Sequence, residues 1–152
     1  NLLVDNSALE GVPCGIVLSG VPGHPIEDIA FSNVSLLLPG GGAAEDAAIT
    51  SLPGFTDQRP EFHVLGEKMP FAGLFARHVR GLRLDDVRFD AARPDARPVI
   101  VCEDVEGLVL RGVDYGDALT GPGFARAGSA RVSWGESDPH QGVFPHAPPS
   151  PY

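Results

Sequence analysis

Apolar residues recur at the same five offsets in three segments of the chain, which begin at Ile26, Val79 and Val105. Within each segment apolar and polar positions alternate, but the alternation slips by one residue halfway along. A period of two is typical of a β-strand with one buried face, whereas an amphipathic helix repeats its apolar residues every three to four positions. Each segment is therefore predicted to be two short strands joined by a corner. The apolar columns are Ile26/Val79/Val105, Ile29/Leu82/Leu108, Phe31/Leu84/Leu110, Val34/Val87/Val113 and Leu36/Phe89/Tyr115.

Two other columns of the same alignment hold residue types that favour a corner. Asn, Asp and Gly most readily adopt the left-handed backbone conformation, in which the chain can change direction sharply. One such column lies where the alternation slips, and the other lies near the start of each copy. We therefore expect two corners in every copy. The columns are Asn33/Asp86/Gly112 and Asp28/Gly81/Gly107.

A further strand is predicted before each copy, over residues 15–18, 73–76 and 98–101. Three strands and three corners then make one coil, and the last two copies begin 26 residues apart, which is within the range of stacked structural repeats. Stacking would place each apolar column inside a cylinder, with successive coils about 4.8 Å apart. The chain is therefore predicted to be all-β, a parallel β-helix of about four coils. The charged residues expected to face solvent are Arg80, Arg83, Arg88, Glu103 and Glu106.

Two loop insertions interrupt this pattern. A short one covers residues 20–24, and a long one covers about residues 39–72. A loop of the second length is either functional or part of an interface, or else it only covers the outside of the cylinder. The organisation predicted from the pattern is β-helix coils over residues 1–117, followed by a cap or irregular tail over residues 118–152.

The charge of the chain limits its partners. The formal net charge is −9, from 11 Lys and Arg against 20 Asp and Glu, and no run of basic residues offsets it. Nucleic acid is therefore not expected as a partner, and a uronate-binding surface would need a local basic cluster. No apolar run is long enough to cross a membrane. The two cysteines, Cys14 and Cys102, are too few for a disulfide framework and have no zinc-type spacing.

Four segments of the sequence resemble the C-terminal coils of bacterial polygalacturonase-like proteins, glycoside hydrolase family 28. The resemblance covers most of residues 14–110 and includes the order of the motifs and the positions of the loops. It implies a right-handed parallel β-helix that acts on pectic polysaccharide, either galacturonan or rhamnogalacturonan, by inverting hydrolysis. It also implies an extracellular or periplasmic location, no cofactor, and upstream β-helix coils of the same protein as the structural partner of this fragment. The segments are SGVPGHPIEDI (19–29), PGGG (39–42), GLFARHVRGL (73–82) and PDARP (94–98).

Inverting hydrolysis requires a carboxylic acid at the glycosidic oxygen and a carboxylate that activates water, roughly 6.5–9.5 Å apart. The family supplies its catalytic groups from an Asp-containing motif, an Asp-Asp pair, a Gly-His-Gly segment and an Arg-Ile-Lys segment, all in coils before the region that this chain resembles. None of the four is matched in this sequence. No catalytic residue and no metal ligand is therefore assigned to the chain, its substrate-binding residues are unknown, and the catalytic Asp residues are expected upstream of it.

Several residues are candidates for a functional role, but each also has a structural explanation. Asp85 and Asp86 imitate the catalytic Asp pair, yet they occupy a corner, where Asp is favoured for backbone reasons. His24 follows a glycine in the short loop, as in the first two residues of the Gly-His-Gly segment. Its structural explanation is a surface residue or one that braces the loop. Arg77 and His78 end a predicted strand, so they could reach a sugar carboxylate or be ordinary surface charge. Two loop residues, Arg59 and Glu61, either line a groove or are solvated. Three histidines have no partner at the spacing of metal ligands, His63, His140 and His146.

Two other functions stay open. The chain could be a non-catalytic β-helix module, structural or carbohydrate-binding, and the upstream sequence would distinguish this from a glycosidase. It could also carry another carbohydrate activity on the same fold, such as a lyase. A lyase would typically hold Ca²⁺ with clustered acidic side chains, and the sequence contains no evident cluster.

Overall fold

A computed structural model describes residues 2–8, 15–48, 68–126 and 131–135. These residues form one sheet of eight strands, in which every pairing between strands is parallel. The described part contains no α-helix and one short 3-10 helix, η1 (Ala44–Ala48). The predicted all-β class with parallel strands is therefore confirmed. The strands are β1 (Leu2–Asp5), β2 (Ile16–Ser19), β3 (Ile26–Leu38), β4 (Leu74–Ala91), β5 (Ile100–Arg111), β6 (Asp114–Tyr115), β7 (Phe124–Arg126) and β8 (Val132–Trp134).

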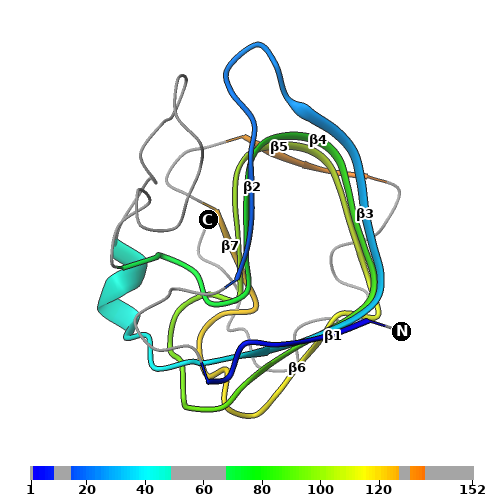
Figure 1. The fold of residues 1–152 in the computed structure, drawn as a ribbon. Helices are drawn as coiled ribbons and strands as arrows, with labels where there is room; N and C mark the ends of the chain where they lie inside the picture. Colours follow the sequence, from blue (N-terminus) through cyan, green and yellow to red (C-terminus); the bar gives the residue numbers. More distant parts are fainter. Residues whose placement is uncertain (1, 9–14, 49–67, 127–130, 136–152) are drawn as a thin grey trace.

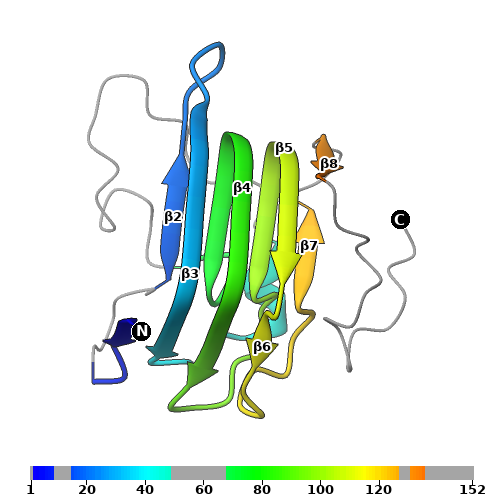
Figure 2. The ribbon, with the colours of Figure 1, turned by 90° about the vertical axis from the view of Figure 1, so that its right-hand side faces the viewer.

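The three longest strands are bent. β4 has 18 residues, whereas β3 and β5 have 13 and 12. In Figure 1 the three lie over one another along a closed outline, and Figure 2 shows them side by side in the order β3, β4, β5. Shorter strands complete the sheet, because β1 pairs with β3, β2 and β6 pair with β4, and β7 and β8 pair with β5. Neighbouring strands thus come from successive copies of the sequence repeat.

The register of the sheet reproduces the predicted apolar columns. Ile26 pairs with Val79, which pairs with Val105, and Leu84 pairs with Leu110. The side chains of these columns form one core, and those of β4 are its most enclosed members. A slip of one residue would turn every apolar side chain of a strand outward. Since burial of one such side chain contributes about 1.5–3 kcal/mol, the apolar columns specify the register strongly.

Both predicted corner columns adopt the left-handed backbone conformation. In the first column φ is 55° at Asn33 and 53° at Asp86. In the second it is 56° at Asp28, 73° at Gly81 and 72° at Gly107. The predicted corners are therefore confirmed, and the alternation slips because one residue at each corner turns the chain without entering the pleat.

The strand before the third copy is shifted by one residue from its predicted position. Ile100, and not Val99, pairs with Leu74, and Val101 pairs with Phe75. Ile100 thereby points into the core, while Val101 points to the opposite face. The sequence could not place this strand because residues 98–102 are almost all apolar, and an unbroken apolar run has no alternation that marks its faces.

One wall of the sheet is covered by apolar side chains on both faces. On its outer face Met69, Phe71, Phe75 and Val101 form a second cluster, which we call the outer cluster. The rings of Phe71 and Phe75 lie 5.7 Å apart between centroids. Cys102 lies on the inner face of the same wall, where burial raises the pKa of its thiol to about 12, so the thiol stays protonated and unreactive at neutral pH.

A buried ion pair lies within one of the segments that carry the family resemblance, and a hydrogen bond links it to a second. Asp95, 1% exposed, accepts hydrogen bonds from Arg97 Nε at 3.0 Å and Nη2 at 2.6 Å. The same carboxylate accepts the backbone N–H of Gly42 at 3.1 Å, and a side chain at Gly42 would collide with Arg97 Nε. Burial would raise the pKa of Asp95, but the hydrogen bonds from Arg97 and Gly42 outweigh it and hold the pKa below its usual range. We call Asp95, Arg97 and Gly42 the brace.

Two short strands extend the sheet within the segment predicted to be a cap or tail. Phe124 of β7 pairs with Ile100, and Val132 of β8 pairs with Val105. The rings of Phe124 and Trp134 lie 5.2 Å apart, and both side chains pack against the core. Parallel stacking therefore continues beyond residue 117 in the described residues.

Candidate functional site

Polar side chains from three successive copies meet where β2, β4 and β5 reach their first corner. In the sheet register Ser19 pairs with Arg77, which pairs with Glu103. The next residues, His78 and Asp104, contact each other. Because Leu74 and Ala76 point into the core and strand side chains alternate, Arg77 points to the outer face. We call Ser19, Arg77, His78, Glu103 and Asp104 the polar corner.

Arg77 is the most enclosed member of the polar corner, with 5% of its surface exposed. Its Nη2 donates a hydrogen bond to Ser19 Oγ at 2.9 Å, and its guanidinium carbon lies 5.9 Å from the centroid of the Phe75 ring. Such a cation over an aromatic face is attracted by the ring quadrupole. The side chain therefore links the polar corner to the outer cluster, and a ligand at the surface would meet little of its guanidinium.

His78 and Asp104 form a close pair on neighbouring strands. The distance from His78 Nδ1 to Asp104 Oδ2 is 2.7 Å, and Asp104 Oδ1 accepts a weaker hydrogen bond from Arg131 Nη2 at 3.3 Å. These bonds, that of His78 first, outweigh partial burial and hold the pKa of the Asp104 carboxyl below its usual value. Asp104 thereby fixes the orientation of the His78 ring between the two strands.

Glu103 departs from its prediction as a solvent-facing residue. Its side chain is partly buried, and its Oε2 is fully buried with no hydrogen-bond partner in the described part of the chain. The other four predicted outward residues, Arg80, Arg83, Arg88 and Glu106, are exposed as expected. Glu103 differs because it stands beside Arg77, on the wall that carries the outer cluster.

The structure keeps the other sequence candidates away from the polar corner. Asp86 is exposed at a corner with φ of 53°, and Asp85 lies beside Arg83 with a closest approach of 3.9 Å. His24 is exposed in a tight turn, bridged to Val21. The candidates that lie outside the described residues are Arg59, Glu61, His63, His140 and His146.

Sequence reasoning singled out Arg77 and His78 but missed Glu103 and Asp104. His78 and Asp104 also form a third corner column, with φ of 49° and 52°. Histidine is a weaker signal of a corner than glycine, asparagine or aspartate. A signal was nevertheless present, because each missed acid follows its partner by 26 residues, the spacing of the repeat. Pairing charges across that spacing would have found them.

Replacing His78 by alanine is expected to raise the pKa of Asp104 toward 3.8, its value without such partners. The pKa of Asp104 is lower in the folded protein than in the unfolded chain. The pair therefore stabilises the fold at a pH above the pKa of the unfolded chain, and this contribution is lost as the pH falls through the pKa of the folded protein. Because Asp104 is 40% exposed, solvent screening limits the contribution to less than about 1 kcal/mol. An NMR titration of the carboxyl carbon measures the shift.

The control for this titration is Arg131→Ala, which removes the longer hydrogen bond and should change the pKa of Asp104 less. An unchanged pKa of Asp104 in the His78→Ala variant would show that the two side chains do not interact in solution.

Comparisons of the chain with models of protein families, with curated proteins and with solved structures each find no match. Among the residues that the structure describes, no group of three or more His, Cys, Asp or Glu side chains is arranged to hold a metal ion. No helix in the same residues is long and apolar enough to cross a membrane.

Proposed function

We propose that this chain forms the last coils of a right-handed parallel β-helix and belongs to a polygalacturonase-like glycosidase. The whole protein would hydrolyse pectic polysaccharide, galacturonan or rhamnogalacturonan, with inversion and outside the cytoplasm. The observation that carries the proposal is the parallel, in-register stack whose neighbouring strands are copies of one repeat. The proposed reaction comes from the resemblance of four segments to glycoside hydrolase family 28, and the brace joins two of these segments, 39–42 and 94–98.

In this proposal the catalytic carboxylates come from other coils. An inverting glycosidase needs two carboxyl groups that face the sugar from opposite sides with room for a water. Asp95 is bound within the brace, Asp104 is paired with His78, and Asp86 occupies a corner. We infer that this chain contributes a frame and one wall of the substrate cleft.

An incomplete edge of the sheet supports the presence of further coils. β1 pairs only with Val34–Leu37 of β3, and no described strand pairs with residues 26–33 on the side away from β4. Ile26, Ile29 and Phe31 are accordingly only partly buried, although their partners in β4 are enclosed. Leu2 and Leu3 of β1 are 57% and 70% exposed. A parallel strand laid along this edge would bury those of these side chains that lie in the apolar columns, Leu2, Ile26, Ile29 and Phe31, and would pair the open backbone groups of β3.

Reducing-sugar release from polygalacturonan and rhamnogalacturonan tests the proposed activity. The assay compares this chain with a longer form that includes the sequence encoded before Asn1. We expect release by the longer form alone, because the catalytic motifs are not matched within these 152 residues.

Each other outcome of this assay contradicts part of the proposal. Release by the short chain would restore Asp85 and Asp86 as catalytic candidates, and the Asp85→Asn and Asp86→Asn variants would test them. Release by neither form would favour a non-catalytic module that serves as structure or binds carbohydrate.

A further inference from the structure

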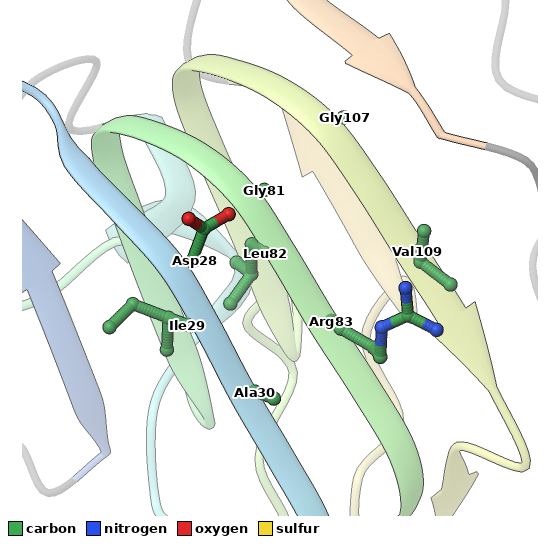
Figure 3. A pocket seen from close by; sticks show the side chains of 8 residues that line it. All are labelled: Asp28, Ile29, Ala30, Gly81, Leu82, Arg83, Gly107 and Val109. Atoms are coloured by element: carbon green, nitrogen blue, oxygen red, sulfur yellow. The ribbon is translucent and has the colours of Figure 1, made fainter.

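A shallow hollow lies on the outer surface of β3, β4 and β5, on the opposite face of these strands from the core. Its volume is about 200 Å³, and the Asp28 carboxylate and the Arg83 side chain both border it (Figure 3). Two glycines of one corner column, Gly81 and Gly107, line it as well, and we call them the glycine floor. Asp28 comes from β3, Arg83 from β4 and Gly107 from β5, so three copies of the repeat build the hollow.

The hollow exists because glycine replaces a side chain at successive corners. The Asp28 carboxylate extends over Gly81, where an added Cβ would come within 3.0 Å of Asp28 Oδ1. Over Gly107, in contrast, an added Cβ would meet nothing closer than the backbone nitrogen of Gly81 at 3.7 Å. A side chain at Gly107 would thus only touch the backbone of Gly81, and because none is present a ligand can approach the backbone of both glycines closely.

In the described part of the chain, Arg83 has fewer carboxylates near its guanidinium than the two other exposed arginines of β4. Arg80 contacts both Glu27 and Glu106, and Arg88 contacts both Asp90 and Asp114. Arg83 has one described carboxylate near it, Asp85, with a closest approach of 3.9 Å, which is too long for a hydrogen bond.

The sheet register explains this difference. The residues paired with Arg83 on the two flanking strands are Ala30 and Val109, which carry no charge. Figure 3 shows the guanidinium of Arg83 beside Val109, at the border of the hollow. In a chain with a net charge of −9, this is a cation left available for an anionic ligand.

We infer that the hollow binds one uronic acid residue of an acidic polysaccharide. Arg83 would hold the sugar carboxylate, since a guanidinium forms two parallel hydrogen bonds with that group. Asp28 would accept hydrogen bonds from sugar hydroxyls, which an anion without hydroxyls cannot offer. A pyranose ring would rest on the glycine floor. The inference rests on the proposed function and adds a binding site for the same substrate class, away from any catalytic carboxylates.

Binding of a galacturonate trisaccharide to this chain, followed by NMR chemical-shift titration, tests the site. The Arg83→Gln variant is expected to bind about tenfold more weakly, because it loses a charge-assisted pair. The matched control is Arg80→Gln, which removes an exposed arginine of the same strand that two carboxylates already neutralise. This control should change the affinity less than about twofold.

A second variant, Gly107→Asn, fills the hollow without removing a charge. The backbone of the corner should accept asparagine, because Asn33 has φ of 55° and Asp28, in the same column, has φ of 56°. We expect the variant to keep the thermal transition of the parent chain and to lose binding of the trisaccharide by about tenfold or more. Binding that survives in a folded Gly107→Asn variant would overturn the site.

Three further outcomes would also overturn the inference. The first is an equal loss of affinity for the trisaccharide in Arg80→Gln and Arg83→Gln. The second is binding of an oligoglutamate as tight as that of the trisaccharide, and the third is no binding of the trisaccharide at millimolar concentration. The titration involves no hydrolysis, so such a failure leaves the proposed glycosidase to the sugar-release assay. An inactive longer form of the protein would, in turn, leave the titration of the hollow valid.

Discussion

Replacement of Asp95 by alanine is expected to lower the free energy of unfolding by about 3–5 kcal/mol, the cost of leaving a buried charge without its partner. The Arg97 guanidinium would lose its two hydrogen bonds to Asp95, from Nε and Nη2. The backbone N–H of Arg97 would lose a third, to Asp95 Oδ1 at 3.0 Å. Gly42 would lose its acceptor as well. The brace would then no longer hold residues 39–42 against residues 94–98. Urea unfolding followed by circular dichroism measures the change.

Two variants show whether the unpaired charge is the cause. Asp95→Ala combined with Arg97→Met removes both charges and should cost less than Asp95→Ala alone, because no buried cation is left unpaired. Asp117→Ala removes an exposed carboxylate from the turn after β6 and should change the free energy of unfolding by less than about 0.5 kcal/mol. If Asp95→Ala cost no more than Asp117→Ala, the brace would not contribute to stability.

Replacement of Phe89 by alanine is expected to cost about 3–5 kcal/mol of unfolding free energy, through lost burial and the cavity that remains. Phe89 is completely buried in β4 and pairs with Leu36 on one side and Tyr115 on the other. The Phe89 and Tyr115 rings stack with centroids 6.2 Å apart. A Cβ added at Gly73 would come within 2.7 Å of the Phe89 ring, so the neighbouring wall has no side chain that could fill the space.

The matched control for this variant is Phe31→Ala. Phe31 is the same residue type in another apolar column, but it lies in β3 at the incomplete edge of the sheet and is only partly buried. The same truncation should therefore cost less than half as much at Phe31 as at Phe89. Equal costs, measured by the same urea unfolding, would mean that the edge at β3 is covered in solution.

The sequence by itself determined the repeat and its corners. Strand alternation and a 26-residue step predicted which side chains stack, and Asn33, Asp28 and Asp86 marked corners because few residue types accept a left-handed backbone. These features are local, so the residues within one copy are enough to reveal them. The function expected from the family resemblance stays a prediction.

The tertiary structure decided what lies between copies. The sequence placed Val99 where Ile100 belongs, because an apolar run is buried on both faces and carries no alternation. It could not show that the oxygen of Glu103 is buried while Arg83 stays available, because both depend on which residues the neighbouring strands place beside them. The hollow has the same origin, since it needs glycine at the same corner of two successive coils, at Gly81 and at Gly107.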